Sequence, residues 1–185
     1  MNRQRWSIWA VVLAVQFAVP FYMAWDWNNV RMDGIPYQWQ CVPRMQHSLM
    51  GPGTLLLDFP ENKAQWLEAD APKWGEPIYV HIAKDEKGVL TVRGATFTRP
   101  DSIDSMKAEA LDLEEGVVRF RVPFDQVLTD TSRIHLERIG PDDQVMASIR
   151  IKNGDGVIEG VFVNGIAIAE YQGNAVKEGT TIEKR

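Results

Sequence analysis

The sequence contains one cysteine, Cys41, among its 185 residues. A single thiol excludes an internal disulfide framework and any zinc or iron–sulfur site that several cysteines would ligate. The chain also lacks a basic excess, because 20 Lys and Arg stand against 25 Asp and Glu, for a net charge of −5. Nucleic-acid binders normally carry a basic face, so this balance argues against nucleic acid as a partner.

Motifs that bind nucleotides or activate a serine are missing as well. No Gly-x-Gly-x-x-Gly or Walker pattern occurs, and Ser48 and Ser148 lack a Gly-x-Ser-x-Gly context. His47, His81 and His135 lie at least 34 residues apart, a spacing that offers no pair of metal ligands. We therefore assign no catalytic residue, no metal site and no cofactor from the sequence.

The chain does have one long apolar run near its N-terminus. Residues 6–25 (WSIWAVVLAVQFAVPFYMAW) carry no formal charge, and they would span roughly 30 Å as a helix, the hydrocarbon thickness of a bilayer. Tryptophans, which favour the headgroup region, lie near both ends of the run: Trp6, Trp9, Trp25 and Trp27. We predict a transmembrane anchor over residues 6–25, with the lipid bilayer as its partner.

A cleaved signal peptide is the main alternative to this anchor. Such peptides have an apolar region of about 7–15 residues followed by a small-x-small cleavage site. The run here is longer, Ala24 has Tyr22 two residues before it, and Ala18 is followed closely by Pro20. An uncleaved anchor is therefore favoured, and a buried core helix ranks third.

Arg3 and Arg5 precede the run, and positive residues favour keeping the short end in the cytoplasm. The remaining 18 Lys and Arg and 25 Asp and Glu give residues 26–185 a net charge of −7. We predict a single-pass protein of the bacterial inner membrane whose C-terminal domain lies in the periplasm or outside. Its parts are a cytoplasmic stub (1–5), the anchor (6–25), a juxtamembrane linker (26–34), an extracytoplasmic β-domain (35–174) and a polar tail (175–185).

After the run, apolar and polar residues alternate with a period of two, which is typical of half-buried strands. The clearest alternations cover residues 78–82, 118–122, 149–152 and 161–164. Turn signals that contain glycine separate them, at residues 86–88, 114–116, 153–156 and 164–165. The pattern predicts a mainly β fold, namely an antiparallel β-sandwich or open barrel that follows a single N-terminal transmembrane helix.

Two segments favour short helices. Residues 60–70 are rich in helix formers, and residues 130–139 begin at Asp130, a good N-cap, although a strand competes in the second segment. Residues 79–97 and 146–163 also resemble each other, with Lys84 and Gly88 matching Lys152 and Gly156 at an offset of 68. Both read as strand, turn and strand, which supports a two-part antiparallel architecture.

The order of these features resembles the GDYXXLXY-domain family of membrane-anchored bacterial proteins. The span precedes a Gly-x-x-Tyr strand at residues 34–39, and the best-matching stretches are residues 122–137 and 147–168. Asp130 and Glu137 fall where that family tends to place two acids seven residues apart. The naming motif is degenerate, since only Leu57 and Phe59 correspond within residues 52–59. The resemblance implies a periplasmic β-domain beside multi-span membrane proteins, without a reaction.

Cys41 alternates with Tyr37 and Trp39, so we predict a buried core position rather than a catalytic thiol or an intermolecular disulfide. His81 falls on the polar face of its strand, and we expect it to be solvated.

Asp125, Asp130 and Glu137 are the best candidates for paired carboxylates in acid–base chemistry. Structural roles are favoured for two of them, because Asp130 suits an N-cap and Glu137 would pair with Arg133 one helical turn away. Residues 152–156 resemble a calcium loop but lack its spaced acids, so we predict a hairpin turn.

We expect an accessory or binding module for a membrane-protein partner. The alternative is a cell-envelope hydrolase that uses two of these carboxylates, and a third hypothesis is a carrier of small or lipidic ligands inside a β-barrel.

Overall fold

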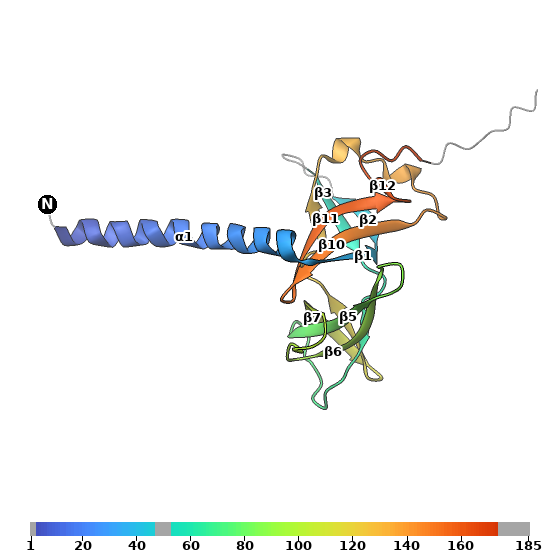
Figure 1. Cartoon of the computed structure of the whole chain (residues 1–185), viewed down its shortest axis with the longest axis horizontal. Coiled ribbons are helices and arrows are strands. Elements are labelled where there is room, and N and C mark those ends of the chain that lie inside the picture. The colour runs from blue at the N-terminus through green and yellow to red at the C-terminus, as the bar shows by residue number, and fades with distance from the viewer. Residues whose placement is uncertain (1–2, 47–52, 174–185) are drawn as a thin grey trace, which may run out of the picture.

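The computed structural model describes residues 3–46 and 53–173, which form one long helix followed by two β lobes (Figure 1). The helix is α1 (Arg3–Asp33). The strands are β1 (Ile35–Gln40), β2 (Val42–Gln46), β3 (Thr54–Asp58), β4 (Lys63–Gln65), β5 (Pro77–Lys84), β6 (Leu90–Thr96), β7 (Ser105–Glu114), β8 (Val117–Arg121), β9 (Gln126–Leu128), β10 (Val145–Lys152), β11 (Asp155–Val163) and β12 (Ile166–Ala167). The expected mainly β fold with antiparallel sheets is confirmed.

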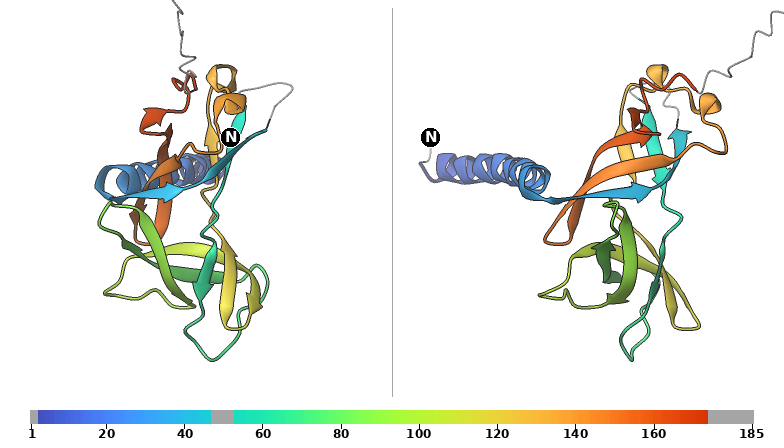
Figure 2. Two further views of the ribbon diagram at one scale, coloured as in Figure 1. Left: turned by 90° about the vertical axis from the view of Figure 1, so that its right-hand side faces the viewer. Right: turned by 45° about the vertical axis from the view of Figure 1, so that its right-hand side comes forward.

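Helix α1 projects away from both lobes, with its N-terminus at the end remote from them (Figures 1 and 2). It continues without interruption through residues 26–33, so the segment expected as a linker is helical. Among the residues whose side chains are described, which leave out residues 1–11, 14 and 26, no helix is long and apolar enough to cross a membrane.

The upper lobe of Figure 1 contains two antiparallel sheets, one with the order β1-β10-β11-β12 and one with the order β2-β3-β9. Strand β10 alternates strictly between buried and half-exposed residues, as its sequence predicts. Its buried side chains, and those of β1 and β11 beside it, belong to the hydrophobic core of the protein.

The lower lobe is a five-stranded antiparallel sheet with the order β4-β8-β7-β5-β6. Its two edges meet, because Trp66 bridges to Ala95 and the Leu67 amide donates to the Ala95 carbonyl at 3.1 Å. β-Bulges in β6, at Arg93, and in β7, at Leu111, increase the twist that this curvature needs. Small and large side chains lie side by side on the inner face, as in the cross-strand pair Ala110 and Phe120. The result is a nearly closed barrel.

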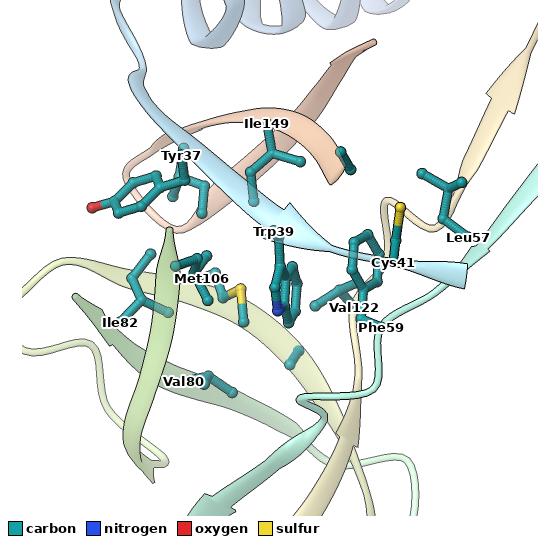
Figure 3. Packing of buried hydrophobic residues seen from close by; sticks show 14 of the residues in the cluster. Tyr37, Trp39, Cys41, Leu57, Phe59, Val80, Ile82, Met106, Val122 and Ile149 are labelled. Atoms are coloured by element: carbon teal, nitrogen blue, oxygen red, sulfur yellow. The ribbon is translucent and has the colours of Figure 1, made fainter. Parts of the chain in front are cut away.

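Trp39 joins the two lobes. It lies on β1 in the upper lobe, opposite Ala147 of β10, whose small side chain leaves space for the indole. The ring stacks on Phe59 with centroids 4.1 Å apart and extends toward Val80 and Met106 of the lower lobe (Figure 3). Its side chain is 0% exposed, so the two lobes share one continuous core rather than two separate ones.

The C-terminal end of α1 is fastened to the upper lobe by several bonds. Lys152 Nζ donates to Asp33 at 2.8 Å and to Asn29 at 3.0 Å. Arg150 donates to the carbonyl of Gly34 at 3.2 Å. A Cβ at Gly34 would lie 2.3 Å from the Val30 carbonyl oxygen, so only glycine lets the chain leave the helix this closely against β10.

All four turns expected from glycine signals are present and join neighbouring antiparallel strands. In the turn between β10 and β11, Asn153 and Gly154 have φ angles of 56° and 91°, as a type I′ hairpin requires. The two similar segments are both hairpins in different sheets, yet their registers differ. Gly88 lies in a turn, whereas its match Gly156 lies within β11.

The two expected helices need correction. Residues 60–70 contain strand β4, not a helix, because Ala64 is buried opposite Val118 and Trp66 donates its indole N–H to the Asp70 carbonyl at 2.8 Å. Tertiary contacts thus override the helix propensity of this segment. Residues 130–139 form two short 3-10 helices, Thr131–Arg133 and Leu136–Arg138, with Asp130 as the N-cap of the first.

Replacing Trp39 by Ala should lower the free energy of unfolding by about 3–5 kcal/mol, since it leaves a large cavity where the two lobes meet. Trp74→Ala is the matched control, because that side chain is 80% exposed, and its effect should stay within about 0.5 kcal/mol. Urea denaturation followed by circular dichroism measures both. Equal stabilities of the two variants would contradict a shared core.

Candidate functional site

A small pocket of about 190 Å³ lies beside this joint, where the end of β3 meets β8 of the lower lobe. Its apolar floor comes from the Trp39–Phe59 stack together with Leu57 and Phe120. The alternation of β3 and β8 turns these side chains inward, and the chain between Phe59 and Asn62 closes one wall.

The indole N–H of Trp39 is a buried hydrogen-bond donor close to this pocket. Its Nε1 atom has no hydrogen-bond partner in the described part of the chain. A buried indole N–H normally finds an acceptor, and leaving it unpaired costs roughly 1–3 kcal/mol. The unpaired N–H is therefore a local cost of placing the indole where the two lobes meet.

Charged side chains form the rim of the pocket. Asp58 pairs with Arg44, and Arg121 donates to Glu109 at 2.7 Å. The bond to Glu109 raises the pKa of Arg121, and the charge of Asp125 adds to that rise. The pocket therefore combines an apolar floor with both signs of charge at its mouth, a lining suited to a small amphiphilic ligand.

Comparisons with family models, with curated proteins and with solved structures all give no match. The resemblance to GDYXXLXY-domain proteins thus stays a prediction that rests on the sequence segments. Within the degenerate motif, the two corresponding residues, Leu57 and Phe59, are both buried beside Trp39.

The three carboxylates singled out from the sequence do not meet in this pocket. Asp125 lines it, but neither Asp130 nor Glu137 does. The side chain of Asp130 accepts hydrogen bonds from the hydroxyl and the amide of Ser132, and these bonds lower its pKa. Glu137 pairs with His135 at 3.1 Å and not with Arg133 as expected, because a short 3-10 turn replaces the helix that would have aligned them.

Cys41 is buried, as its alternation with Tyr37 and Trp39 predicts. The side chain is 3% exposed, and burial raises the pKa of its thiol to about 12. A neutral, enclosed thiol is a poor nucleophile, so the geometry gives no support to a catalytic or intermolecular disulfide role. His47 and Ser48, which were also considered from the sequence, lie outside the described residues.

His81 is buried rather than solvated, contrary to expectation. His81 lies on the face of β5 opposite the buried Ile78, Val80 and Ile82, but the fold covers that face too, and the imidazole is 7% exposed. Its Nε2 lies 2.9 Å from the Thr96 hydroxyl, and burial lowers its pKa. Because it is paired within the sheet, His81 has a structural role.

A second, more polar pocket of about 340 Å³ lies in the seam between the lobes, near the end of α1. Tyr37 donates its hydroxyl proton to Asp104 across this seam at 2.5 Å, and burial followed by this bond raises the pKa of Tyr37. The buried hydroxyl of Ser105 also lines the pocket and has no partner among the described residues. The bond between Tyr37 and Asp104 holds the lobes together here.

Sequence reasoning found Asp125 but missed Asp58, Asn62 and Arg121 beside it. Asp58 lies on β3, Arg121 lies on β8 of another sheet, and Asn62 lies in the segment between β3 and β4, so no spacing in the sequence brings them together. The one available signal was the alternation of Leu57, Asp58 and Phe59, which predicts an exposed Asp58 between two buried residues.

The Cys41 thiol should resist modification by a thiol reagent at pH 8 in the folded protein and react fully in denaturant, because both its burial and its raised pKa suppress the thiolate. The matched control is Val42→Cys, since the neighbouring side chain is 51% exposed and a thiol there should react at once. Rapid labelling of Cys41 in the native protein would contradict its placement in the core.

Proposed function

We propose that the protein is a membrane-anchored periplasmic β-domain that serves as an accessory or binding module for a membrane-protein partner. The observation that carries this proposal is the exposure of large apolar side chains on α1. They are 40–75% exposed: Val12, Leu13, Val15, Phe17, Val19, Phe21, Tyr22, Met23 and Trp25. Positions this closely spaced occupy every side of a helix, and a helix that is apolar all round belongs in protein or in lipid.

The length of the apolar run favours lipid. Residues 6–25 match the roughly 30 Å of a bilayer core, and α1 projects from the lobes without packing against them along this run (Figure 1). Covering one large apolar side chain contributes about 1.5–3 kcal/mol, so nine of them together provide ample free energy for insertion. The tryptophans near both ends of the run suit the two headgroup layers.

The direction of insertion rests on charge. Arg3 and Arg5 precede the run, while the rest of the chain has a net charge of −7 from 18 basic and 25 acidic residues. This asymmetry favours a cytoplasmic N-terminus and a periplasmic β-domain in the bacterial inner membrane. The resemblance of the sequence to GDYXXLXY-domain proteins supports the same arrangement.

The binding role is supported by the pocket beside Trp39, with its apolar floor and charged rim. A hydrolase that uses two of the three candidate carboxylates has weaker support, because Asp130 and Glu137 are bound within their own turns.

A periplasm-dependent reporter fused after Arg185 should be active and should stay in the membrane pellet after an alkaline carbonate wash. The variant Leu13→Lys/Phe17→Lys should release the fusion, because each lysine in mid-membrane costs about 2.5–3.5 kcal/mol. Trp74→Lys, outside the run, is the matched control and should stay in the pellet. Release of the unmodified chain, or a mature mass that lacks residues 1–24, would contradict an uncleaved anchor.

The accessory role predicts a stable partner. The full chain, solubilised in mild detergent and purified through a C-terminal tag, should retain one membrane protein in reproducible stoichiometry, identified by mass spectrometry. A variant with Asp125→Asn and Arg121→Gln tests whether the pocket contributes to that interaction. Recovery of the chain alone from several detergents would overturn the accessory role without touching the anchor.

A further inference from the structure

A second concave surface, the juxtamembrane groove, lies where α1 meets the upper lobe. It encloses about 570 Å³ between the helix residues Trp27, Val30 and Arg31 and the strands β9 and β11. Its opposite wall is largely apolar and includes Leu128 and Val157. Trp27 is 60% exposed and Leu128 is 76% exposed, so each wall of this groove carries an uncovered apolar side chain.

Of the three charged side chains that line the groove, the two acidic ones have ion-pair partners. Asp155 is neutralised by Lys107 at 2.7 Å, and Glu159 is neutralised by Arg150 at 2.7 Å. Among the residues whose side chains are described, which leave out residue 26 of the same helix, Arg31 has no ion-pair partner. An occupant of the groove therefore meets apolar walls and one uncompensated positive charge, which suits an anionic group attached to an apolar body.

The position of the groove along α1 limits what that occupant is. Trp27 lies two residues beyond Trp25, at the end of the apolar run, and Arg31 lies about 9 Å beyond Trp25 at 1.5 Å per residue. A headgroup layer is roughly 5–8 Å thick, and a long arginine side chain reaches back several ångströms toward it. If residues 6–25 cross the bilayer, the mouth of the groove lies at the level of the lipid phosphates.

We propose that the juxtamembrane groove binds one anionic phospholipid from the bilayer that holds α1. The phosphate lies against the Arg31 guanidinium, and the glycerol and upper acyl segment lie between Trp27 and Leu128. Figure 2 shows β10 and β11 beside the end of α1. This inference rests on the proposed anchor, because only an inserted α1 brings lipid within reach of Arg31.

The test uses the full chain in vesicles of phosphatidylglycerol and phosphatidylcholine that contain a lipid spin-labelled near its headgroup. A fluorophore is attached to Leu128→Cys, while Cys41 stays unlabelled because it is buried. We expect the spin label to quench this fluorophore. The control is Ile166→Cys, 47% exposed on β12 at the end of the upper lobe remote from α1, and its fluorophore should remain bright (Figure 1). Equal quenching at the two positions overturns the proposal.

A second variant tests the charge. Arg31→Gln in the Leu128→Cys background should weaken the dependence of quenching on phosphatidylglycerol about fivefold, the effect of one cation at a membrane surface. Arg133→Gln, remote from the groove, should leave it unchanged. Undiminished dependence in Arg31→Gln overturns the assignment of the phosphate to Arg31.

Flotation of the vesicles distinguishes a failure of the proposed anchor from a failure of the proposed lipid site. A chain that fails to float with the vesicles refutes the anchor. A chain that floats while the Leu128 fluorophore stays as bright as the control refutes the groove alone. That second outcome is also the one expected if the groove binds a protein, which these vesicles do not contain, in place of a lipid.

Discussion

The packing of the Trp39 indole is the contact on which the rest of the molecule depends. Strand β1 belongs to the upper lobe by its hydrogen bonds with β10, yet its largest side chain extends into the lower lobe. The ring is stacked on Phe59, which precedes the crossing of the chain into the barrel. One side chain therefore sets how two sheets of different curvature meet, and it also forms the floor of the pocket between them.

The second organising feature is the rigid attachment of α1. The helix ends at Asp33, β1 begins at Ile35, and the single residue between them is packed too tightly to accept a Cβ. Lys152 and Arg150, neighbours on β10, bind the helix end and the following carbonyl. The groove beside Arg31 exists because this attachment holds the helix against the sheet at a fixed angle.

The strands were predictable because their physical cause is local. Alternation in residues 145–152 reflects one buried and one exposed face, and the Asn-Gly turns specify their own backbone geometry. The errors arose where distant residues decide the structure. Residues 60–70 have helix formers, but the burial of Ala64 against β8 selects a strand. His81 lies on the outer face of β5, as alternation predicts, yet it is buried because distant residues cover that face. The pocket was only partly predictable for the same reason, since Asp58 and Asp125 meet through sheet packing.

The unbroken path from α1 into β1 makes the helix and the upper lobe behave as a lever. A small tilt of the helix within its surroundings would swing the far end of the lobes through a larger arc, and a rotation about the helix axis would turn a different face of the barrel toward its neighbours. Gly34 is packed closely between Val30 and Arg150, so the connection between α1 and β1 has no flexible residue to absorb such a movement. The rotation of α1 about its own axis therefore determines which surface of the β lobes faces neighbouring molecules.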